Sequence, residues 1–78
     1  MAAAASSVVQ LDLRGVKCPL NWARAKVRLE RMRRHEVLEL MLDDPRGVRD
    51  IPNAAEAEGY AVIECVRVDG AWRMRIER

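Results

Sequence analysis

Cys18 is the residue of this 78-residue sequence whose surroundings favour chemistry, and it stands directly before Pro19. Proline is favoured at the first position of a helix, because its missing N–H has no partner inside the helix there. We therefore expect a helix to begin at Pro19, with Cys18 in the N-cap position. The helix dipole and the nearby charges of Arg14 and Lys17 favour a thiolate, the nucleophilic form of cysteine. An inert small residue at a helix cap is the alternative.

The other candidate groups predict structure rather than catalysis. Cys65 is expected on the core side of a strand, where burial raises the pKa of a thiol and shields it. Two cysteines and one histidine give no metal-ligand spacing, and the four scattered glycines form no phosphate-binding loop. The adjacent Asp43 and Asp44 are expected to act in a turn or cap rather than in acid–base catalysis. We therefore expect no metal and no separate cofactor.

The elements that must position Cys18 follow from the hydrophobic pattern. Alternating apolar and polar residues predict strands over Val8–Leu13 and Glu36–Asp43. Between them, apolar residues three and four positions apart predict a helix from Pro19 to about Arg34. His35 follows, and histidine tolerates the left-handed conformation in which a helix often ends.

The second half of the chain predicts a short helix and a hairpin. Asp50 offers an N-cap for a helix that runs through Glu58, and Gly59 follows as its C-terminal glycine. The dipeptide Asp69-Gly70 is a strong signal for a two-residue hairpin loop. The residues on its two sides therefore form the last two strands of the chain.

The two-residue loop fixes the expected register of the hairpin. Facing residues lie on one side of a sheet. The bulky apolar residues of the last strand are expected to point to the core, as are the residues that face them. The expected core pairs are Cys65 with Met74 and Ile63 with Ile76, and Glu64 with Arg75 is expected as an exposed ion pair. The opposite face of the sheet would then carry apolar residues that could meet a partner: Val8, Val37, Met41, Val62, Val66 and Val68.

The order βαβαββ predicts an α+β fold, a two-layer sandwich with two helices on one face of a four-stranded mixed sheet. The first βαβ unit should be parallel and right-handed. A chain this short forms one domain with a thin core and little room for a deep pocket. We expect this domain to span residues 8–78, after a flexible tail at residues 1–7.

Two motifs in this sequence resemble those of one protein family. The segment from Leu11 to Pro19, LDLRGVKCP, resembles the L-D-x-x-G-x-x-C-P opening of TusA-like (SirA-type) sulfur-carrier proteins. A second signature of that family is matched, in the right order, by Asp43-Asp44-Pro45, Asp50-Ile51-Pro52 and Gly59-Tyr60. The resemblance covers residues 8–78 and implies the same βαβαββ sandwich.

The resemblance implies that Cys18 carries sulfur as a persulfide and is the catalytic residue, supported by Arg14, Gly15, Lys17 and Pro19. It implies a sulfur-donor protein, such as a cysteine desulfurase or a rhodanese-like protein, and a sulfur-acceptor protein. Sulfur relays of this family serve tRNA thiolation, molybdenum-cofactor metabolism or sulfur oxidation. The chain would be a sulfurtransferase-like persulfide carrier rather than an enzyme with a pocket, with no cofactor beyond the persulfide. The family usually has a second proline where this chain has Asn21, whose side chain we expect to bond back toward the cap.

The net charge of +2 conceals a polarised sequence. Residues 14–34 hold eight basic residues and one acidic residue, a balance of +7, and the other segments balance at −5. We expect Arg24, Arg28 and Arg31 to form a docking surface for acidic proteins. The alternatives are an RNA- or ribosome-binding module that uses the basic helix, and a structural subunit that self-associates through the exposed sheet face.

Composition and sequence pattern indicate the compartment of the protein and the classes of partner that are not expected. The apolar runs are far shorter than the roughly 20 residues that cross a bilayer, so no membrane span is expected. Only Trp22, Tyr60 and Trp72 are aromatic, which gives no base-stacking platform, so direct nucleic-acid binding is not expected. The first residues do not resemble a secretory signal, and two cysteines are too few for a disulfide framework. These features predict a cytoplasmic protein.

Overall fold

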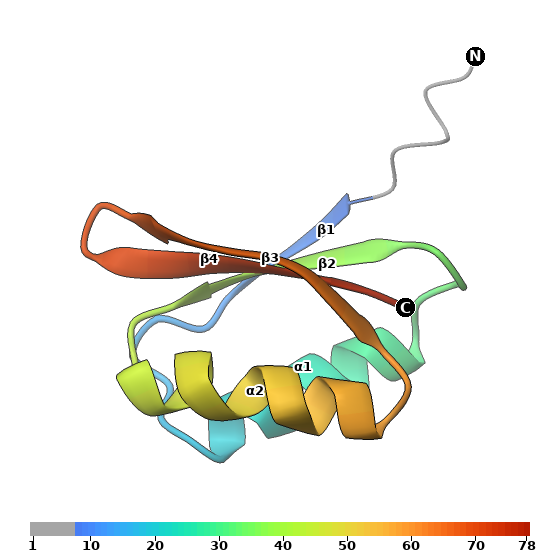
Figure 1. Cartoon of the computed structure of the whole chain (residues 1–78), viewed down its shortest axis with the longest axis horizontal. Helices are drawn as coiled ribbons and strands as arrows, with labels where there is room; N and C mark the ends of the chain where they lie inside the picture. The colour runs from blue at the N-terminus through green and yellow to red at the C-terminus, as the bar shows by residue number, and fades with distance from the viewer. Residues whose placement is uncertain (1–7) are drawn as a thin grey trace.

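The computed structural model describes residues 8–78 and has the expected α+β fold (Figure 1). The predicted tail at residues 1–7 lies outside the described residues. The chain order is β1, α1, β2, α2, β3 and β4. Their bounds are Val8–Asp12, Leu20–Glu30, Val37–Leu42, Pro45–Ala57, Ala61–Val68 and Ala71–Glu77. Within residues 8–78, no helix is long and apolar enough to cross a membrane.

The four strands form one mixed sheet in the order β1-β2-β4-β3, and both helices cover the same face (Figure 1). β1 pairs with β2 in parallel, whereas β4 runs antiparallel to both β2 and β3. Parallel neighbours need a crossover connection, which α1 supplies. The loop between β1 and α1, which carries Cys18, therefore lies at the end of the sheet where β2 leads into α2.

The core lies between the sheet and the helices. In β2, the leucines at alternate positions are fully buried, as period-two alternation predicts. From α1, Ala25 and Leu29 cover them, and Ile51 and Ala55 do so from α2. The remaining buried members of this cluster are Leu13, Met32, Met74 and Ile76.

The first helix is shorter than predicted. α1 ends at Glu30, and the Arg31 N–H donates to the carbonyl of Arg28, which closes the helix with a tight turn. The apolar spacing continues to the buried Met32, but that residue reaches the core from the turn after the helix. The prediction for His35 is confirmed, because its φ of 74° is left-handed.

The prediction that the second helix starts after Asp50 is wrong. α2 begins at Pro45, and its N-cap is Asp44, whose side chain accepts from the Arg46 N–H. Pro45 occupies the first helical turn, where proline needs no donor. Pro52 lies inside the helix rather than in its first turn.

The predicted hairpin register is confirmed from Val68–Ala71 to Glu64–Arg75 and is wrong beyond that pair. A register irregularity between Val62 and Glu64 brings Val62 opposite Ile76, so Val62 packs against the core. Ile63, predicted in the core, is 53% exposed. An extra residue in one strand of a pair shifts all later pairs by one residue. The sequence here contains no residue type that predicts this irregularity.

Cys65 faces Met74 as predicted, but it is exposed rather than buried. β3 is one of the two edge strands of the sheet, so a residue on its helix-facing side has a neighbouring strand on one side only. Desolvation by the surrounding protein still raises the pKa of the Cys65 thiol.

Charged side chains of β2, β3 and β4 form ion pairs across the face of the sheet that carries no helices. Arg75 donates to Glu39 at 3.0 Å and also lies 3.4 Å from Glu64. The predicted Glu64–Arg75 pair is therefore confirmed, but both residues are partly buried rather than exposed. Arg73 lies 3.6 Å from the same oxygen of Glu64. The charges divide the valines of this face into separate groups, and Val62, expected among them, lies on the helix side. Self-association through this face stays a prediction.

Arg78 ties the last strand to the end of α1. Its Nη1 donates to the carbonyls of Leu29 and Glu30, both at 3.0 Å, and to that of Met32. Carbonyls at the C-terminal end of a helix lack partners inside the helix. A cation there also interacts favourably with the negative end of the helix dipole.

We therefore expect Arg78→Ala to lower the free energy of unfolding by about 2 kcal/mol, as for hydrogen bonds to a charged group. The measurement is urea denaturation followed by circular dichroism. Arg34→Ala is the matched control, because Arg34 is exposed and forms no ion pair with any described residue. Equal stability of the two variants would contradict the capping role.

Candidate functional site

Cys18 lies in the loop that leads from β1 into α1, and its side chain is partly exposed. The prediction that it is the N-cap is wrong by one residue, because α1 begins at Leu20 and Pro19 is the N-cap. Pro19 makes no side-chain cap, since it has no polar side-chain atom. The Cys18–Pro19 peptide bond is cis. The thiol thus lies just before the N-terminal turn of α1, where the positive end of the helix dipole is still near.

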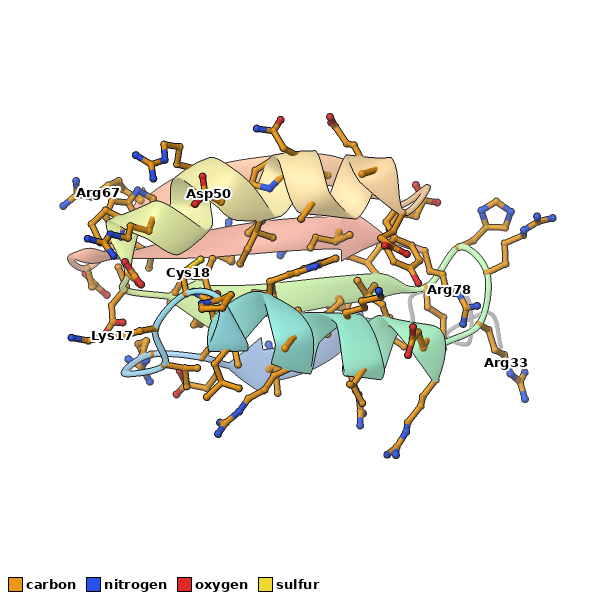
Figure 2. The ribbon with its side chains drawn as sticks, turned by 90° about the horizontal axis from the view of Figure 1, so that it is seen from below. Lys17, Cys18, Arg33, Asp50, Arg67 and Arg78 are labelled. Atoms are coloured by element: carbon orange, nitrogen blue, oxygen red, sulfur yellow. The ribbon has the colours of Figure 1, made fainter. Side chains whose placement is uncertain are left out.

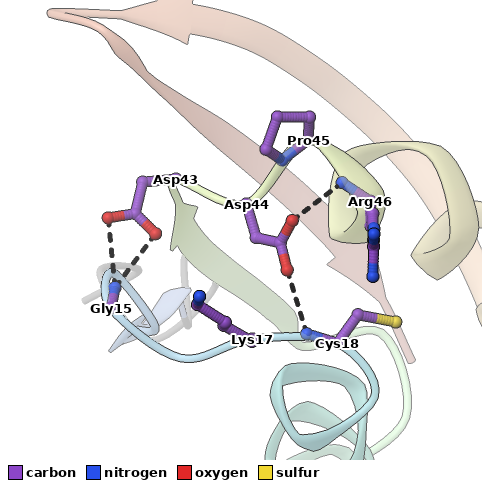
Figure 3. Close-up of a pocket in the computed structure, with 7 residues that line it drawn as sticks. All are labelled: Gly15, Lys17, Cys18, Asp43, Asp44, Pro45 and Arg46. Carbon is purple, nitrogen blue, oxygen red and sulfur yellow. Dashed lines mark hydrogen bonds between the residues drawn. The ribbon is translucent and has the colours of Figure 1, made fainter.

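Two carboxylates from the end of β2 hold the Cys18 loop (Figure 3). The Gly15 N–H donates to Asp43 Oδ1 at 3.0 Å and to Oδ2 at 3.1 Å. The Cys18 N–H donates to Asp44 Oδ2 at 3.0 Å, and Asp44 Oδ1 accepts from the Arg46 N–H at 3.0 Å. Asp44 therefore uses one oxygen for the Cys18 loop and the other to cap α2.

These hydrogen bonds favour the ionised form of Asp44. The pKa of its carboxyl is lowered, first by the Cys18 N–H, then by the Arg46 N–H, and less by the charges of Arg46 and Lys17. Gly15 has a φ of 84°, a conformation that glycine adopts without strain, and this turns its N–H toward Asp43. Asp43 and Asp44 thus have the turn and cap roles expected of them.

A cavity of about 490 Å³ adjoins Cys18 (Figure 3). Its other lining residues are Gly15, Lys17, Asp43, Asp44, Pro45 and Arg46. Of the residues predicted to support Cys18, the structure brings Gly15 and Lys17 to this cavity and places Pro19 at the start of α1. Arg14 does not line it.

The guanidinium of Arg14 instead binds Asp12. Its Nε donates to Asp12 Oδ1 at 2.9 Å and its Nη2 to Oδ2 at 2.8 Å, and these bonds lower the pKa of Asp12 to about 2. The charge of Arg14 is therefore balanced by a neighbour two residues away rather than directed at Cys18.

The sequence did not indicate Arg46 and Arg49. Arg46 lines the cavity with Cys18. Arg49 lies one turn further along α2, and its pKa is raised first by the hydrogen bond to Asp50 and least by an electrostatic interaction with Cys18. Both were placed outside the expected second helix, so nothing in their spacing linked them to the cysteine. The cap at Asp44 was the signal that could have found them.

Asn21 lies where α1 meets α2, and it is fully buried. Its Oδ1 accepts from the next N–H, that of Trp22, at 2.7 Å, so the expected bond back toward the cap is wrong. Its Nδ2 has no hydrogen-bond partner. A Cβ atom on Gly47 of α2 would lie 2.5 Å from this nitrogen. The buried amide thus takes the space that only a glycine in α2 leaves open.

The predicted docking residues are exposed: Arg24 and Arg28 on α1, and Arg31 directly after it. None of them forms an ion pair with a described residue. Leu20 and Val27 lie on the same side of the helix, two turns apart, and each is 51% exposed. α1 therefore presents cations around an apolar strip that starts two residues after Cys18. Within residues 8–78, no group of acidic, histidine and cysteine side chains is placed to hold a metal ion.

Comparison with known proteins identifies the family. The model of the family described as "Sulfurtransferase TusA" matches residues 9–78. The chain belongs to the TusA family. This TusA-family chain is 35% identical over 69 residues to a putative sulfur carrier protein of Archaeoglobus fulgidus, covering 87% of this chain and 78% of the relative. It is 32% identical over 69 residues to the sulfur carrier protein TusA of Allochromatium vinosum, covering 88% and 91%.

A solved structure shows the same fold. The SirA-like protein of Desulfitobacterium hafniense superposes on this TusA-family chain with a TM-score of 0.78 at 24% identity, covering 88% of this chain and 95% of the other. The predicted family and fold class are therefore confirmed.

The contact between the helices predicts a double-mutant effect. Gly47→Ala should lower the free energy of unfolding by about 1–3 kcal/mol, because the new methyl group clashes with the buried Asn21 amide. In an Asn21→Ala background, the same change should raise it by up to about 1 kcal/mol, because alanine favours helix over glycine. Urea denaturation of the four proteins measures both effects. The same sign in both backgrounds would contradict the contact.

The Asp44 carboxylate predicts a pH-dependent effect. Asp44→Asn keeps one acceptor oxygen and turns an NH₂ group toward the second N–H, so the melting temperature should fall at neutral pH. Because folding lowers the pKa of Asp44 from 3.8, its contribution is present above that value and is lost as the pH falls through the lower, folded value. The melting temperatures of the variant and the parent protein should therefore converge in acid.

Asp50→Asn is the matched control, since Asp50 binds only the side chain of Arg49 among the described residues. The control should melt close to the parent protein at neutral pH. A difference between Asp44→Asn and the parent that stays constant down to pH values below the folded pKa would contradict the role of the charge.

Proposed function

We propose that this protein is a sulfur carrier, which receives sulfane sulfur as a persulfide on Cys18 and passes it to an acceptor protein. The single observation that carries this proposal is the partly exposed thiol at the start of α1, on a loop that Asp43 and Asp44 hold in place. Membership of the TusA family and the names of the relatives support it. The relay would operate in the cytoplasm, where thiols stay reduced.

The transfer is a thiol–disulfide type exchange. The Cys18 thiolate attacks the terminal sulfur of the donor's persulfide, the donor's S–S bond breaks, and the donor thiolate leaves with the electron pair. The S–S bond that forms on Cys18 replaces the one that breaks, so the step needs no outside oxidant or reductant. Unloading repeats the exchange, with Cys18 as the leaving thiolate. A carrier of this kind needs an accessible thiol rather than an enclosed pocket.

The α1 surface is proposed to dock a protein partner. Arg24, Arg28 and Arg31 would face carboxylates of the partner, and the exposed strip at Leu20 and Val27 would give the apolar contact. Paired charges at the edge of an interface mainly raise the association rate, whereas buried apolar contact slows dissociation. This surface starts beside Cys18, so a protein bound to it would have its own reactive sulfur within reach of the thiol.

RNA binding is the second candidate, favoured by the unpaired arginines of α1. Both tryptophans are partly buried, Trp22 against the core and Trp72 beneath Arg67, so neither offers a free face for base stacking. A salt titration of RNA binding separates the two functions. Affinity that falls steeply with salt and is the same in Cys18→Ala would favour RNA binding.

The carrier function is tested by the mass of the intact protein after incubation with a cysteine desulfurase and cysteine, or with a rhodanese and thiosulfate. We expect the addition of one sulfur atom, which is lost in Cys18→Ala. Cys65→Ala is the matched control and should keep the added sulfur, because Cys65 lies on the edge strand rather than beside the cavity. No added sulfur with either donor would contradict the function.

A further inference from the structure

We propose that the open edge of β1 binds an extended segment of a protein partner as a fifth strand, and that acidic side chains of this segment pair with Arg24 and Arg28 of α1. The proposal rests on the carrier function above and adds the way in which a partner is held beside α1. β1 has β2 as a neighbour on one side only, so its other edge is open. This strand leads into the loop that carries Cys18.

The first observation is a row of backbone groups that point away from the sheet. The Leu13 N–H donates to the carbonyl of Met41 at the end of β2. Consecutive residues of a strand direct their N–H and C=O groups to opposite edges. The groups of Val8, Gln10 and Asp12 therefore point away from β2. Such a row of unpaired donors and acceptors is a template for another strand.

The second observation is that β1 lacks the features that protect an edge strand. Charged residues, proline and bulges keep such strands from pairing with another chain. β3, the other edge strand, has a register irregularity between Val62 and Glu64 and carries a second charge at Arg67. The segment Val8–Leu11 has no charged residue, proline or glycine, and it pairs with β2 in a regular register. Of the two edges, β1 is therefore the one suited to strand addition.

The third observation is the position of two arginines on the side of α1 that faces this edge. Figure 2 shows α1 over the β1 side of the sheet and α2 over the β3 side. Lys26 lies on the α2 side of α1, because its Nζ is 3.3 Å from Glu58, the C-cap of α2. A helix turns by about 100° per residue, so Arg24 and Arg28 lie about 200° from Lys26. They therefore project from α1 on the side where β1 is the outermost strand.

The charges on this side of α1 favour an acidic partner. Arg24 and Arg28 are exposed, and neither forms an ion pair within the part of the chain that the structure describes. The one acidic residue of β1, Asp12, is already bound by Arg14. A strand added beside β1 would turn alternate side chains toward α1, where aspartate or glutamate would meet the arginines. Two copies joined through β1 would instead bring the same arginines of both α1 helices together, and like charges disfavour that pairing.

A segment bound in this way would hold the partner during sulfur exchange. Main-chain hydrogen bonds supply the affinity of an added strand, and its alternate side chains supply the specificity. One end of the added strand would lie where β1 leads into the Cys18 loop. The partner would thus be kept beside the thiol in loading and in unloading alike.

The test uses a short synthetic peptide, blocked at both ends, in which valine alternates with glutamate. The peptide is titrated into isotope-labelled protein, and the exchange of each backbone amide in heavy water is followed by NMR. At saturation we expect the amides of Gln10 and Asp12 to exchange at least about ten-fold more slowly, because they donate to the peptide. The amides of Ile63 and Cys65, on the opposite edge, should keep their rates.

Two variants of Gln10 test the role of the backbone. Gln10→Pro removes the outward N–H and places a ring on the open edge, a change that edge strands tolerate. Gln10→Ala is the matched control, because it keeps that N–H. We expect the proline to weaken peptide binding by about ten-fold or more and the alanine by less than about two-fold. Val8→Pro, at the first residue of β1, blocks the same edge if Gln10→Pro does not fold.

A double charge reversal tests the role of the arginines. We expect Arg24→Glu/Arg28→Glu to weaken peptide binding by about ten-fold or more at low salt and by less at high salt. Arg33→Glu/Arg34→Glu is the matched control, because it makes the same charge change after the end of α1. The control should weaken binding less than the test variant does.

Four results would overturn the proposed strand addition. They are unchanged exchange at Gln10, an equal loss in Gln10→Pro and Gln10→Ala, an equal loss in both double variants, and a parent protein that sediments as a dimer with Gln10 already protected. The dimer would make a second copy the occupant of the edge. Failure of the carrier function is distinct, because the parent protein would then take up no sulfur from any donor, whether or not it bound the peptide.

Discussion

The Asp44 carboxylate joins two segments that lie 26 residues apart in the chain, and the geometry around Cys18 depends on that connection. One oxygen accepts the N–H of Cys18, and the other accepts the N–H of Arg46 and so begins α2. Because one rigid group does both, the position of the thiol is coupled to the position of the second helix. Asp43 adds a second attachment two residues before Lys17, at Gly15. A loop that would otherwise be free between β1 and α1 is thereby held at two points.

The contact that places the two helices relative to each other lies at the same end of the molecule as Cys18. α1 and α2 meet at the buried pair of Asn21 and Gly47, close to their N-termini. The family usually has a proline where this chain has Asn21, and here the amide fills the space that Gly47 leaves. Cys18 thus lies where the N-termini of the two helices approach one another.

Much of the fold could be predicted because it depends on local patterns. The alternation in β2, the hairpin at Asp69-Gly70 and the left-handed His35 each have a short-range physical cause, and all three are confirmed. The start of α2 was missed because an N-cap at Asp44 and one at Asp50 look alike in sequence. The exposure of Ile63 and Cys65 was missed because an irregularity in an edge strand depends on long-range pairing. The approach of Arg46 to Cys18 is a property of the tertiary structure alone.

The candidate site was predicted in part. Cys18 was found from its dipeptide and its family motif, and Gly15 and Lys17 do line the cavity beside it. The charge of Arg14 was expected to act on the thiol but is taken up by Asp12. Counting charges along a segment cannot show which of them are paired, since pairing is decided by side-chain geometry. In the structure, Lys17 and Arg46 line the cavity beside the thiol together with Asp43 and Asp44.

The most direct measurement of the central claim is where the sulfur resides after loading. Trypsin separates the two cysteines, because Cys18 lies between Lys17 and Arg24 and Cys65 lies between Arg49 and Arg67. The loaded protein would be alkylated, digested and analysed by mass spectrometry. We predict one extra sulfur atom on the peptide of residues 18–24 and none on that of residues 50–67. Sulfur on the Cys65 peptide, or equally on both, would contradict the account.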